Sequence, residues 1–265
     1  MAPQPTLQTI VIDRISPGAV LFSYNQPKIS NAFTLEQYHN LRDALVWARD
    51  EKDVRVVALT GKGKHYCAGK VLTPPGKGPT IEQEIEAGRG LADVLVGYPK
   101  VLIAAVNGAA IGWGCTQLFN FDLVYASQRA IFQTPFMSMA FVPEGASSYT
   151  FPKVMGKQHA NRLLLAAEKL SAQEMYVSGL VTEVIPGEQA EFVDAVCEKA
   201  KRIGTFNAEA LRMCKALVNK PTDIARQREA SVLEGHDLKV RLNSDDAKAM
   251  VKAFLDRTGK SKSKL

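Results

Sequence analysis

The first half of the chain alternates short apolar runs with segments of helical periodicity. The apolar runs that predict strands cover residues 10–12, 19–22, 54–60, 101–106, 123–126 and 130–132. Nearly all of them lack charged residues, as strands buried on both faces of a parallel sheet do. Apolar positions three or four apart predict a helix that begins after Thr34, and a second helix is expected over residues 82–96. This alternation predicts an α/β core.

The second half is mainly helical in pattern. Capping boxes are expected at Thr34 with Gln37 and at Ser171 with Glu174, because each pair has the Ser/Thr-x-x-Glu/Gln spacing of a helix start. Pro221 separates two late helices. We therefore expect three parts: a core with the active site over residues 1–200, a helical region over 201–259 and a flexible tail over 260–265.

Composition and charge narrow the classes of function. With 46% hydrophobic residues among 265, the chain can bury a large core, which excludes global disorder. No apolar run reaches the roughly 18 residues of a membrane span, and no signal peptide is expected. Much of the net charge of +6 comes from the last nine residues, which carry four basic side chains and no acid, so nucleic-acid binding is disfavoured. The four cysteines are scattered without metal or disulfide spacing, and no metal is expected.

Several common catalytic motifs are absent from the sequence. It contains no GxxxxGK[ST] phosphate loop, no GxGxxG dinucleotide loop, no GxSxG nucleophile elbow and no HExxH zinc motif. Phosphoryl transfer, hydride transfer, triad hydrolysis and zinc hydrolysis therefore lose most of their support.

Two loops of small residues follow the predicted buried strands, at residues 67–70 (CAGK) and 112–114 (GWG). With the segments around them, they give a pattern that resembles the enoyl-CoA hydratase/isomerase (crotonase) superfamily. The matching segments occur in family order: residues 31–34 (NAFT), 65–69 (HYCAG), 105–112 (AVNGAAIG), 121–126 (FDLVYA), 132–136 (FQTPF), 143–148 (PEGASS) and 178–184 (SGLVTEV).

The resemblance implies a ClpP-like spiral of repeated ββα units with a helical C-terminal region that mediates trimerisation. It also implies an oxyanion hole formed by the backbone N–H groups of Lys70 and Trp113, which would stabilise the enolate of an acyl-CoA thioester. Coenzyme A is part of that substrate, so no separate cofactor is expected. Expected substrate contacts are Lys28, Ala32, Ala68, Gly69, Val71, Leu72, Gly112 and Phe136.

The acidic residues indicate which reaction follows the enolate. Hydratases of this family carry two glutamates, and the matching positions here are Thr116 and Phe136. Glu144 lies in an apolar stretch, and its PEGASS context resembles the Δ3,Δ2-enoyl-CoA isomerases, especially their peroxisomal branch. There one glutamate moves a proton from C2 to C4. Desolvation would raise the pKa of such a carboxyl toward neutrality. The alternative is an ordinary acid at a helix start.

Ser263-Lys264-Leu265 matches a peroxisomal targeting tripeptide, which predicts a peroxisomal location and binding to an import receptor. A homotrimer or hexamer is expected from the resemblance, in which Lys252 and Phe254 would reach a neighbouring subunit's ligand. His65 is a weaker candidate for a second acid or base. The predicted function is isomerisation of 3-enoyl-CoA to trans-2-enoyl-CoA in fatty-acid β-oxidation. The alternatives are an enoyl-CoA hydratase or other crotonase of a peroxisomal pathway, and an acyl-CoA-binding pseudoenzyme.

Overall fold

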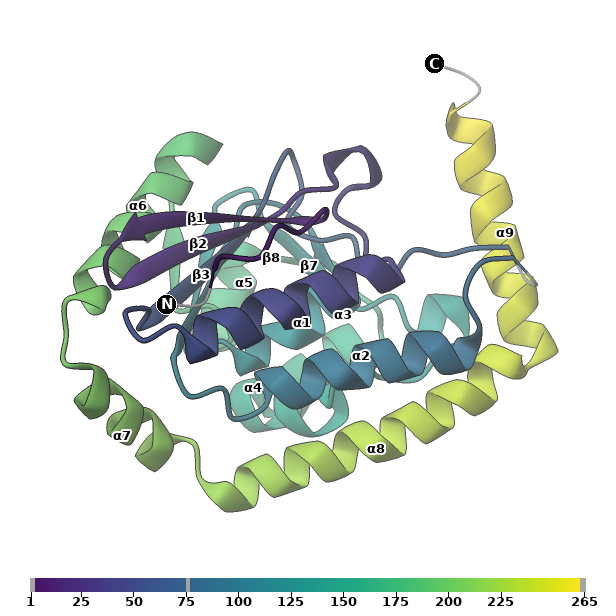
Figure 1. Cartoon of the computed structure of the whole chain (residues 1–265). Coiled ribbons are helices and arrows are strands. Elements are labelled where there is room, and N and C mark those ends of the chain that lie inside the picture. The colour runs from purple at the N-terminus through teal and green to yellow at the C-terminus, as the bar shows by residue number, and fades with distance from the viewer. Residues whose placement is uncertain (1–2, 75–76, 263–265) are drawn as a thin grey trace.

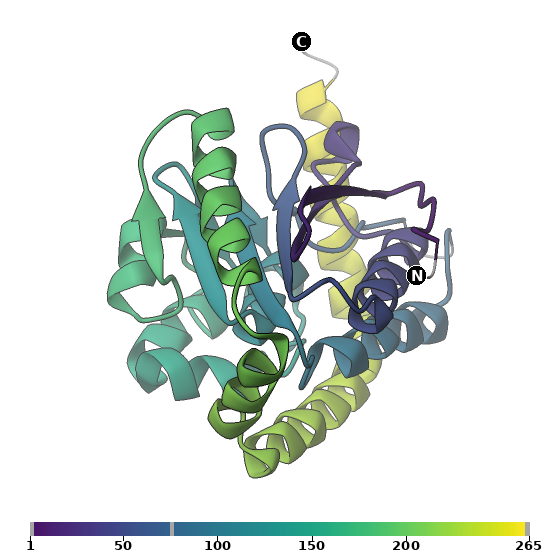
Figure 2. The ribbon, with the colours of Figure 1, turned by 60° about the vertical axis from the view of Figure 1, so that its left-hand side comes forward.

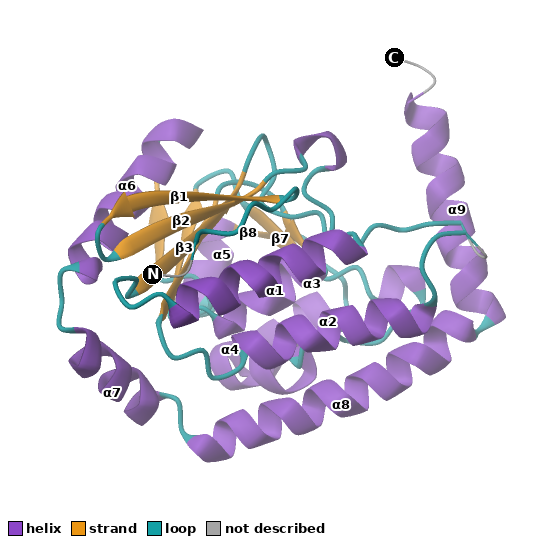
Figure 3. Cartoon of the chain, viewed as in Figure 1, coloured by secondary structure: helices purple, strands orange, loops and turns teal. Residues whose placement is uncertain are grey.

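The computed structural model describes residues 3–74 and 77–262, with the backbone alone for 258–262 (Figures 1 and 3). The strands are β1 (Ile10–Ser16), β2 (Ala19–Tyr24), β3 (Val56–Gly61), β4 (Val101–Val106), β5 (Ala110–Ile111), β6 (Leu123–Ser127), β7 (Ile131–Gln133), β8 (Leu170–Ser171) and β9 (Glu183–Ile185). The helices are α1 (Leu35–Asp50), α2 (Ile81–Leu95), α3 (Trp113–Thr116), α4 (Ser147–Leu164), α5 (Ala172–Val177), α6 (Gln189–Gly204), α7 (Ala208–Val218), α8 (Pro221–Asn243) and α9 (Asp245–Lys262). Short 3-10 turns are η1 (Pro27–Ile29), η2 (Gln117–Asn120) and η3 (Met137–Met139). The predicted alternation of strands and helices is confirmed.

The main sheet has six strands in the order β1-β2-β3-β4-β6-β9. Only the β1–β2 pair is antiparallel, and the other four pairs are parallel. Its central strands β3 and β4 send alternate side chains to two separate cores: Leu102 and Ala104 face one core, whereas Ile103 and Ala105 face the other. Burial on both faces explains the uncharged runs of the sequence.

Helices cover both faces of this sheet. The larger core holds buried residues of α1 and α2, which lie side by side (Figure 1). The smaller core holds Phe192, Val196 and Ala200 of α6, which crosses the other face of the sheet (Figure 2). A second sheet, β5-β7-β8, is short and lies beside the loops that follow β3 and β4.

The last three helices leave the core and return to it. Figure 1 shows α8 running below α2 and then turning into α9, and α8 contacts both α2 and α4. The boundary predicted at residue 200 falls inside α6, which continues to Gly204 because Ile203 still packs in the smaller core. The tail predicted to be flexible from residue 260 is helical to Lys262. Residues 263–265, with the targeting tripeptide, lie outside the described residues. Within the described residues, no helix combines the length and apolar character that crossing a bilayer requires.

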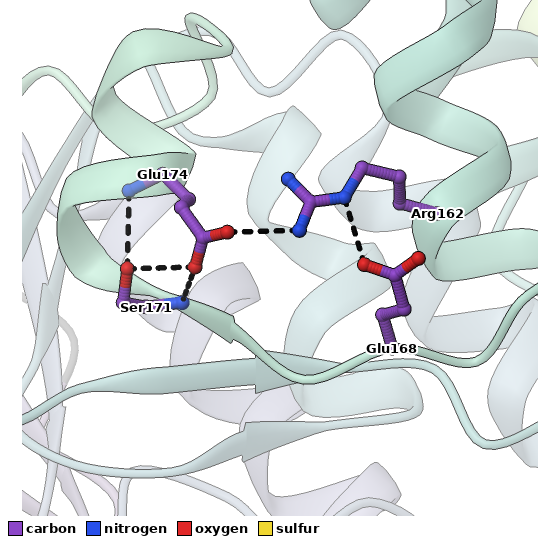
Figure 4. A network of polar contacts seen from close by, with 4 residues as sticks. All are labelled: Arg162, Glu168, Ser171 and Glu174. Atoms are coloured by element: carbon purple, nitrogen blue, oxygen red, sulfur yellow. Dashed lines mark hydrogen bonds and ion pairs between the residues drawn. The ribbon is translucent and has the colours of Figure 1, made fainter.

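One predicted capping box is confirmed and the other is wrong. At α5, Ser171 and Glu174 form both reciprocal hydrogen bonds, and Arg162 links Glu174 to Glu168 (Figure 4). At α1, Thr34 accepts from the Gln37 N–H at 3.2 Å. The Gln37 side-chain oxygen, however, accepts from the Gln26 Nε2 at 2.5 Å, and its Nε2 donates to Asn31 O at 3.1 Å. The oxygen is therefore not paired with the backbone N–H of Thr34.

Candidate active site

The loop after β3 carries the first of the two predicted oxyanion amides. Lys70 forms a parallel β-bridge with Phe33. In this bridge the Phe33 N–H donates to Gly69 O at 2.7 Å, and the Val71 N–H donates to Phe33 O at 3.0 Å. Phe33 therefore bonds to the residues on either side of Lys70, so the N–H of Lys70 itself points away from Phe33.

The second amide belongs to Trp113, the first residue of α3. An N–H in the first turn of a helix has no acceptor within that helix, so it is free to bind another group. The preceding Gly112 has φ 53° and ψ −123°, a conformation that glycine adopts far more readily than other residues. This turn aims the start of α3 toward the first loop.

Backbone contacts join the two loops. Cys67 forms a parallel bridge with Ala110: the Cys67 N–H donates to Ala109 O at 3.0 Å, and the Ile111 N–H donates to Cys67 O at 2.9 Å. A Cβ atom on Gly69 would lie only 2.8 Å from Ile111 O. The two amides are thus carried by two segments in direct contact.

Two buried asparagines hold the segments that lead into these loops. The Asn31 Nδ2 donates to Lys62 O at 3.0 Å and to His65 O at 2.8 Å. The Asn107 Nδ2 donates to Gly63 O at 3.0 Å, and its Oδ1 accepts from the Gly61 N–H at 3.1 Å. These bonds satisfy buried backbone groups that the sheet does not pair. They fix the path of both loops beyond the strand ends.

Glu144 lies in the turn between η3 and α4, beside the second loop. A Cβ atom on Gly112 would be 3.8 Å from its Oε1. The backbone amide of Trp113 lies close enough to the carboxylate to lower its pKa. The predicted base and one predicted oxyanion amide therefore lie in contact.

The surroundings of Glu144 suit reversible proton transfer. Burial raises the pKa of its carboxyl to about 7, and the negative charges of Glu234 and Glu84 act in the same direction. The positive charge of Lys70 and the hydrogen bond from Trp113 lower this pKa. Near neutral pH both protonation states are populated, which is the condition for a group that must first accept and later return a proton.

Glu144 borders a pocket of about 80 Å³ between α1, α2 and α8. Most of the apolar part of its wall comes from these three helices, and the rest from Trp113 of α3 and the turn before α4: Tyr38, Ile85, Gly88, Ala92, Trp113, Gly145, Gly235, Leu238 and Leu242. Its charged residues are Lys70, Glu84, Arg89, Glu144 and Glu234. An apolar pocket with a few polar groups on one side is the usual form of a site for a small organic ligand.

A second pocket, of about 150 Å³, adjoins the first and shares Lys70, Glu84 and Leu242 with it. The Lys70 ammonium pairs with the Glu84 carboxylate between the two pockets. The remaining wall of the second pocket is the loop of Leu72, Thr73, Pro74, Lys77 and Pro79, together with Ile81, Phe141 and residues Ala247, Lys248 and Val251 of α9. The C-terminal helices of the chain thus help to enclose the space in front of Glu144.

The other predicted contact residues occupy varied places. Gly69, Gly112, Val71 and Leu72 belong to the loops or the second pocket, and Ala32 and Ala68 lie beside the Phe33–Lys70 bridge. Lys28 is exposed in η1. Phe136 is buried in the larger core and lines neither pocket, since its ring packs inward. His65 is partly buried, and burial lowers the pKa of its imidazole. On α9, Lys248 rather than Lys252 lines the second pocket.

The two positions that match the hydratase glutamates are both buried and carry no charge. Thr116 is fully buried in α3, and among the described residues its hydroxyl has no hydrogen-bond partner. Phe136 is 3% exposed. Among the site residues predicted from the sequence, Glu144 is thus the one that brings a carboxylate to the second predicted oxyanion amide.

Five charged or polar residues of the first pocket carry no signal that marks them as site residues in the sequence: Tyr38, Glu84, Arg89, Ser231 and Glu234. Tyr38 fits the apolar periodicity of the first predicted helix, which indicates a core position rather than a site residue. Glu84 and Glu234 lie on helices whose other acids face solvent, and no motif marks them. Their helical positions, on the same face as neighbouring buried residues, are the one signal that the sequence offers.

Comparison with known proteins agrees with this geometry. The sequence profile of the family described as enoyl-CoA hydratase/isomerase matches residues 15–262. Human enoyl-CoA delta isomerase 2 is 37% identical over 266 residues, which span 96% of this chain and 64% of the human protein. Mouse peroxisomal enoyl-CoA delta isomerase 3 is 34% identical over 208 residues, which span 77% and 65%. The chain thus spans slightly less than two thirds of the length of these relatives.

The fold is also similar to a solved structure. The crystal structure of an enoyl-CoA hydratase/isomerase from Pseudoalteromonas atlantica superposes on this chain with a TM-score of 0.83 at 28% identity. The superposition covers 94% of this chain and 98% of the bacterial chain.

Proposed function

Because the chain belongs to the enoyl-CoA hydratase/isomerase family and has the crotonase fold, we propose that it isomerises 3-enoyl-CoA to trans-2-enoyl-CoA. Glu144 is the proton shuttle of this proposal, and the backbone N–H groups of Lys70 and Trp113 bind the thioester oxygen. The observation that carries the proposal is a single carboxylate, with a pKa near neutrality, against the Trp113 amide. The names of the human and mouse relatives support the same reaction.

The reaction needs one base and a place for negative charge. Glu144 takes the proton from C2, and the electron pair of that C–H bond forms the enolate, whose charge collects on the thioester oxygen. Two aligned amides stabilise this charge, and the loss of one such donor typically costs about 3–4 kcal/mol of transition-state stabilisation. The dienolate then takes the proton from Glu144 at C4, which leaves the double bond between C2 and C3. Protons and electrons balance without a further reactant.

Substrate binding would also strengthen the base. In the absence of substrate the Trp113 amide stabilises the Glu144 carboxylate and lowers its pKa. A thioester oxygen that takes this amide as its hydrogen-bond donor would draw it away from the carboxylate. The carboxylate would then lose this stabilisation at the moment when it must accept a proton. This exchange couples binding to activation.

Further parts of the proposal concern binding, location and assembly. The acyl-CoA would run along Ala68, Gly69, Val71 and Leu72, with Lys28, Ala32 and Gly112 as additional contacts and no cofactor beyond the CoA of the substrate. A peroxisomal location is supported by the name of the mouse relative and by the Ser263-Lys264-Leu265 sequence. A fluorescent fusion with and without this tripeptide would test that location. The chain would assemble as a homotrimer or hexamer.

Separate incubation with 3-enoyl-CoA and 2-enoyl-CoA tests the reaction. We expect 3-enoyl-CoA to give the conjugated 2-enoyl product, and Glu144→Gln to reduce kcat by about 10²–10⁴-fold, the usual contribution of general acid–base catalysis. Glu86→Gln, an exposed acid of α2, is the matched control and should keep full activity. Hydration of 2-enoyl-CoA without any double-bond migration would favour the hydratase alternative. Binding of acyl-CoA without turnover would favour a pseudoenzyme.

A further inference from the structure

The start of α4 is capped by a side chain from another helix. Glu234 of α8 accepts the Ala146 N–H on Oε2 at 2.6 Å and the Ser148 N–H on Oε1 at 2.8 Å. Its side chain is almost completely buried, with 6% of the residue exposed. A carboxylate is well suited to this place, because the first N–H groups of a helix lack partners and carry partial positive charge.

The segment that Glu234 holds is the one that carries Glu144. Ala146 adopts a left-handed φ of 61° at the start of α4 and has no side chain that could cap the helix. The Ser147 hydroxyl donates to Glu144 O at 2.8 Å. The backbone from residue 144 to residue 148 is therefore fixed on one side by its own hydrogen bonds and on the other by Glu234.

Glu234 also faces Glu144 across the first pocket, which both residues line. The other charged or titratable side chains around this pocket are Tyr38 of α1, Lys70 of the first loop, and Glu84 and Arg89 of α2. The Lys70 ammonium pairs with the Glu84 carboxylate, so its positive charge stabilises Glu84 as well as Glu144. Within this set, burial raises the pKa of the Glu234 carboxyl, whereas the hydrogen bonds from Ser148 and Ala146 lower it and hold its charged form in place.

We propose that Glu234 is a positioning residue for proton transfer: its carboxylate fixes the turn that bears Glu144 and presents a fixed negative charge to the same pocket. This inference rests on the proposed function of Glu144. The two roles make different demands on residue 234. Holding the turn requires the length and the two oxygens of the side chain, whereas the electrostatic role requires only its charge. A residue that merely stabilised α4 would affect folding and leave the chemistry of the folded enzyme unchanged.

Three variants of the full-length protein separate these roles. Glu234→Gln keeps the size of the side chain but removes its charge and one of its two acceptor oxygens. Glu234→Asp keeps the charge and shortens the reach. Glu229→Gln removes a charge from an exposed position of the same helix and is the control. Each variant is assayed for kcat, KM and the pH dependence of kcat/KM on 3-enoyl-CoA, and its folding is followed by circular dichroism.

The acidic limb of the pH profile is the decisive measurement. Burial and the charge of Glu234 both raise the pKa of Glu144, and the base must be ionised to act. Glu234→Gln should therefore move the acidic limb of kcat/KM to lower pH, so that the variant keeps a larger share of its maximal rate at pH 6 than the wild type. Glu234→Asp should leave the limb in place and lower kcat by about 10–100-fold, as displaced catalytic groups do. Glu229→Gln should change neither.

The inference is wrong if folded Glu234→Gln and Glu234→Asp proteins both keep the wild-type kcat and pH profile, since Glu234 would then be only a structural cap. If Glu234→Gln does not fold, the Glu234→Asp protein still decides the positioning role through kcat. A wild-type protein that does not isomerise 3-enoyl-CoA would overturn the proposed function instead. Isomerase activity lost in Glu144→Gln but unaffected by residue 234 would leave that function intact and remove only this inference.

Discussion

The carboxyl of Glu144 links the activity of the molecule to its stability. Its pKa of about 7 arises mainly from burial, opposed by Lys70 and by the Trp113 amide. Since the ionised form is the base, we expect kcat/KM of the wild type to fall as the pH decreases through about 7, with a slope of one on logarithmic axes. A profile that stays level down to pH 5 would contradict this assignment. Stopped assays with 3-enoyl-CoA in buffers of constant ionic strength would measure it.

The same pKa has a consequence for folding. Between the ordinary glutamate pKa of 4.5 and the folded value of about 7, the folded protein binds more protons than the unfolded chain. Stability must therefore fall as the pH rises through this interval, and the loss is complete above pH 7. Glu144→Gln removes this loss, so we expect it to unfold at a higher temperature than the wild type at pH 8, with a smaller difference at pH 5. Thermal unfolding followed by circular dichroism at both pH values tests the point, and a difference independent of pH would contradict it.

At the scale of elements, the contact between the two loops proposed to carry the oxyanion amides depends on glycines, which have no Cβ atom. Gly69 has φ +82°, and a Cβ atom there would lie 2.8 Å from Ile111 O. Gly69→Ala should push the loops apart and displace the Lys70 amide from a shared acceptor. We expect kcat to fall by about 10²–10³-fold, the usual effect of losing one oxyanion donor. Near-wild-type kcat in a folded Gly69→Ala protein would argue against a role for this amide.

The helices that wall the first pocket contain glycines whose positions have room for a side chain. A Cβ atom on Gly88 of α2 would lie 3.7 Å from the Tyr38 ring, and one on Gly235 of α8 would lie 3.9 Å from Ile85. Neither contact is a clash, and glycine within a helix costs about 1 kcal/mol relative to alanine. Gly88→Ala and Gly235→Ala should therefore stabilise the protein by about 1 kcal/mol each. If the acyl chain occupies this pocket, they should also lower kcat/KM for long acyl chains about tenfold relative to short ones.

Gly90 provides the control for this pair. Gly90 follows Arg89 in α2, and no atom lies within 4 Å of the place that an added Cβ atom would occupy. Gly90→Ala should give the same gain in the free energy of unfolding without any change in chain-length preference. Equal chain-length profiles for the wild type and all three variants would show that the acyl chain does not enter the first pocket.

The elements themselves were largely predictable, because their signals are local. The buried strands β3, β4 and β6 follow from uncharged runs, and the start of α5 follows from the Ser171–Glu174 pair. The start of α1 shows where such reasoning ends. Thr34 caps that helix as predicted, but Gln37 bonds to Asn31, because the fold of the preceding turn offers a buried carbonyl that the local pattern does not reveal.

At the scale of the whole molecule, the candidate site combines local and distant contributions. The two loops proposed to carry the oxyanion amides, and the position of Glu144 beside the second of them, follow from segments that resemble a known family. Glu234 could not, because its two hydrogen bonds join residues 86 and 88 positions apart and depend on the path of α8. Lys215 is a similar case: on an otherwise exposed helix, its ammonium is buried because it donates to Asp122 and to Lys100 O, both at 2.7 Å. Tertiary packing determines whether such residues are buried and which groups they bond to, and the local sequence does not reveal it.

The exposed face of α7 leads to a prediction about assembly. Met213, Leu217 and Val218 are 54%, 79% and 72% exposed, although large apolar side chains seldom gather on the surface of a monomer. A symmetric oligomer would cover them with copies of the same chain. We expect light scattering to give three or six times the chain mass of 28.9 kDa, and the double variant Leu217→Glu and Val218→Glu to give smaller species. Arg226→Glu, a charge change at an exposed position of α8, is the control and should keep the wild-type mass.

A monomeric wild type would mean that this apolar face of α7 has another role. If the dissociated double variant loses the proposed isomerase activity, the second pocket needs a neighbouring subunit to hold the substrate.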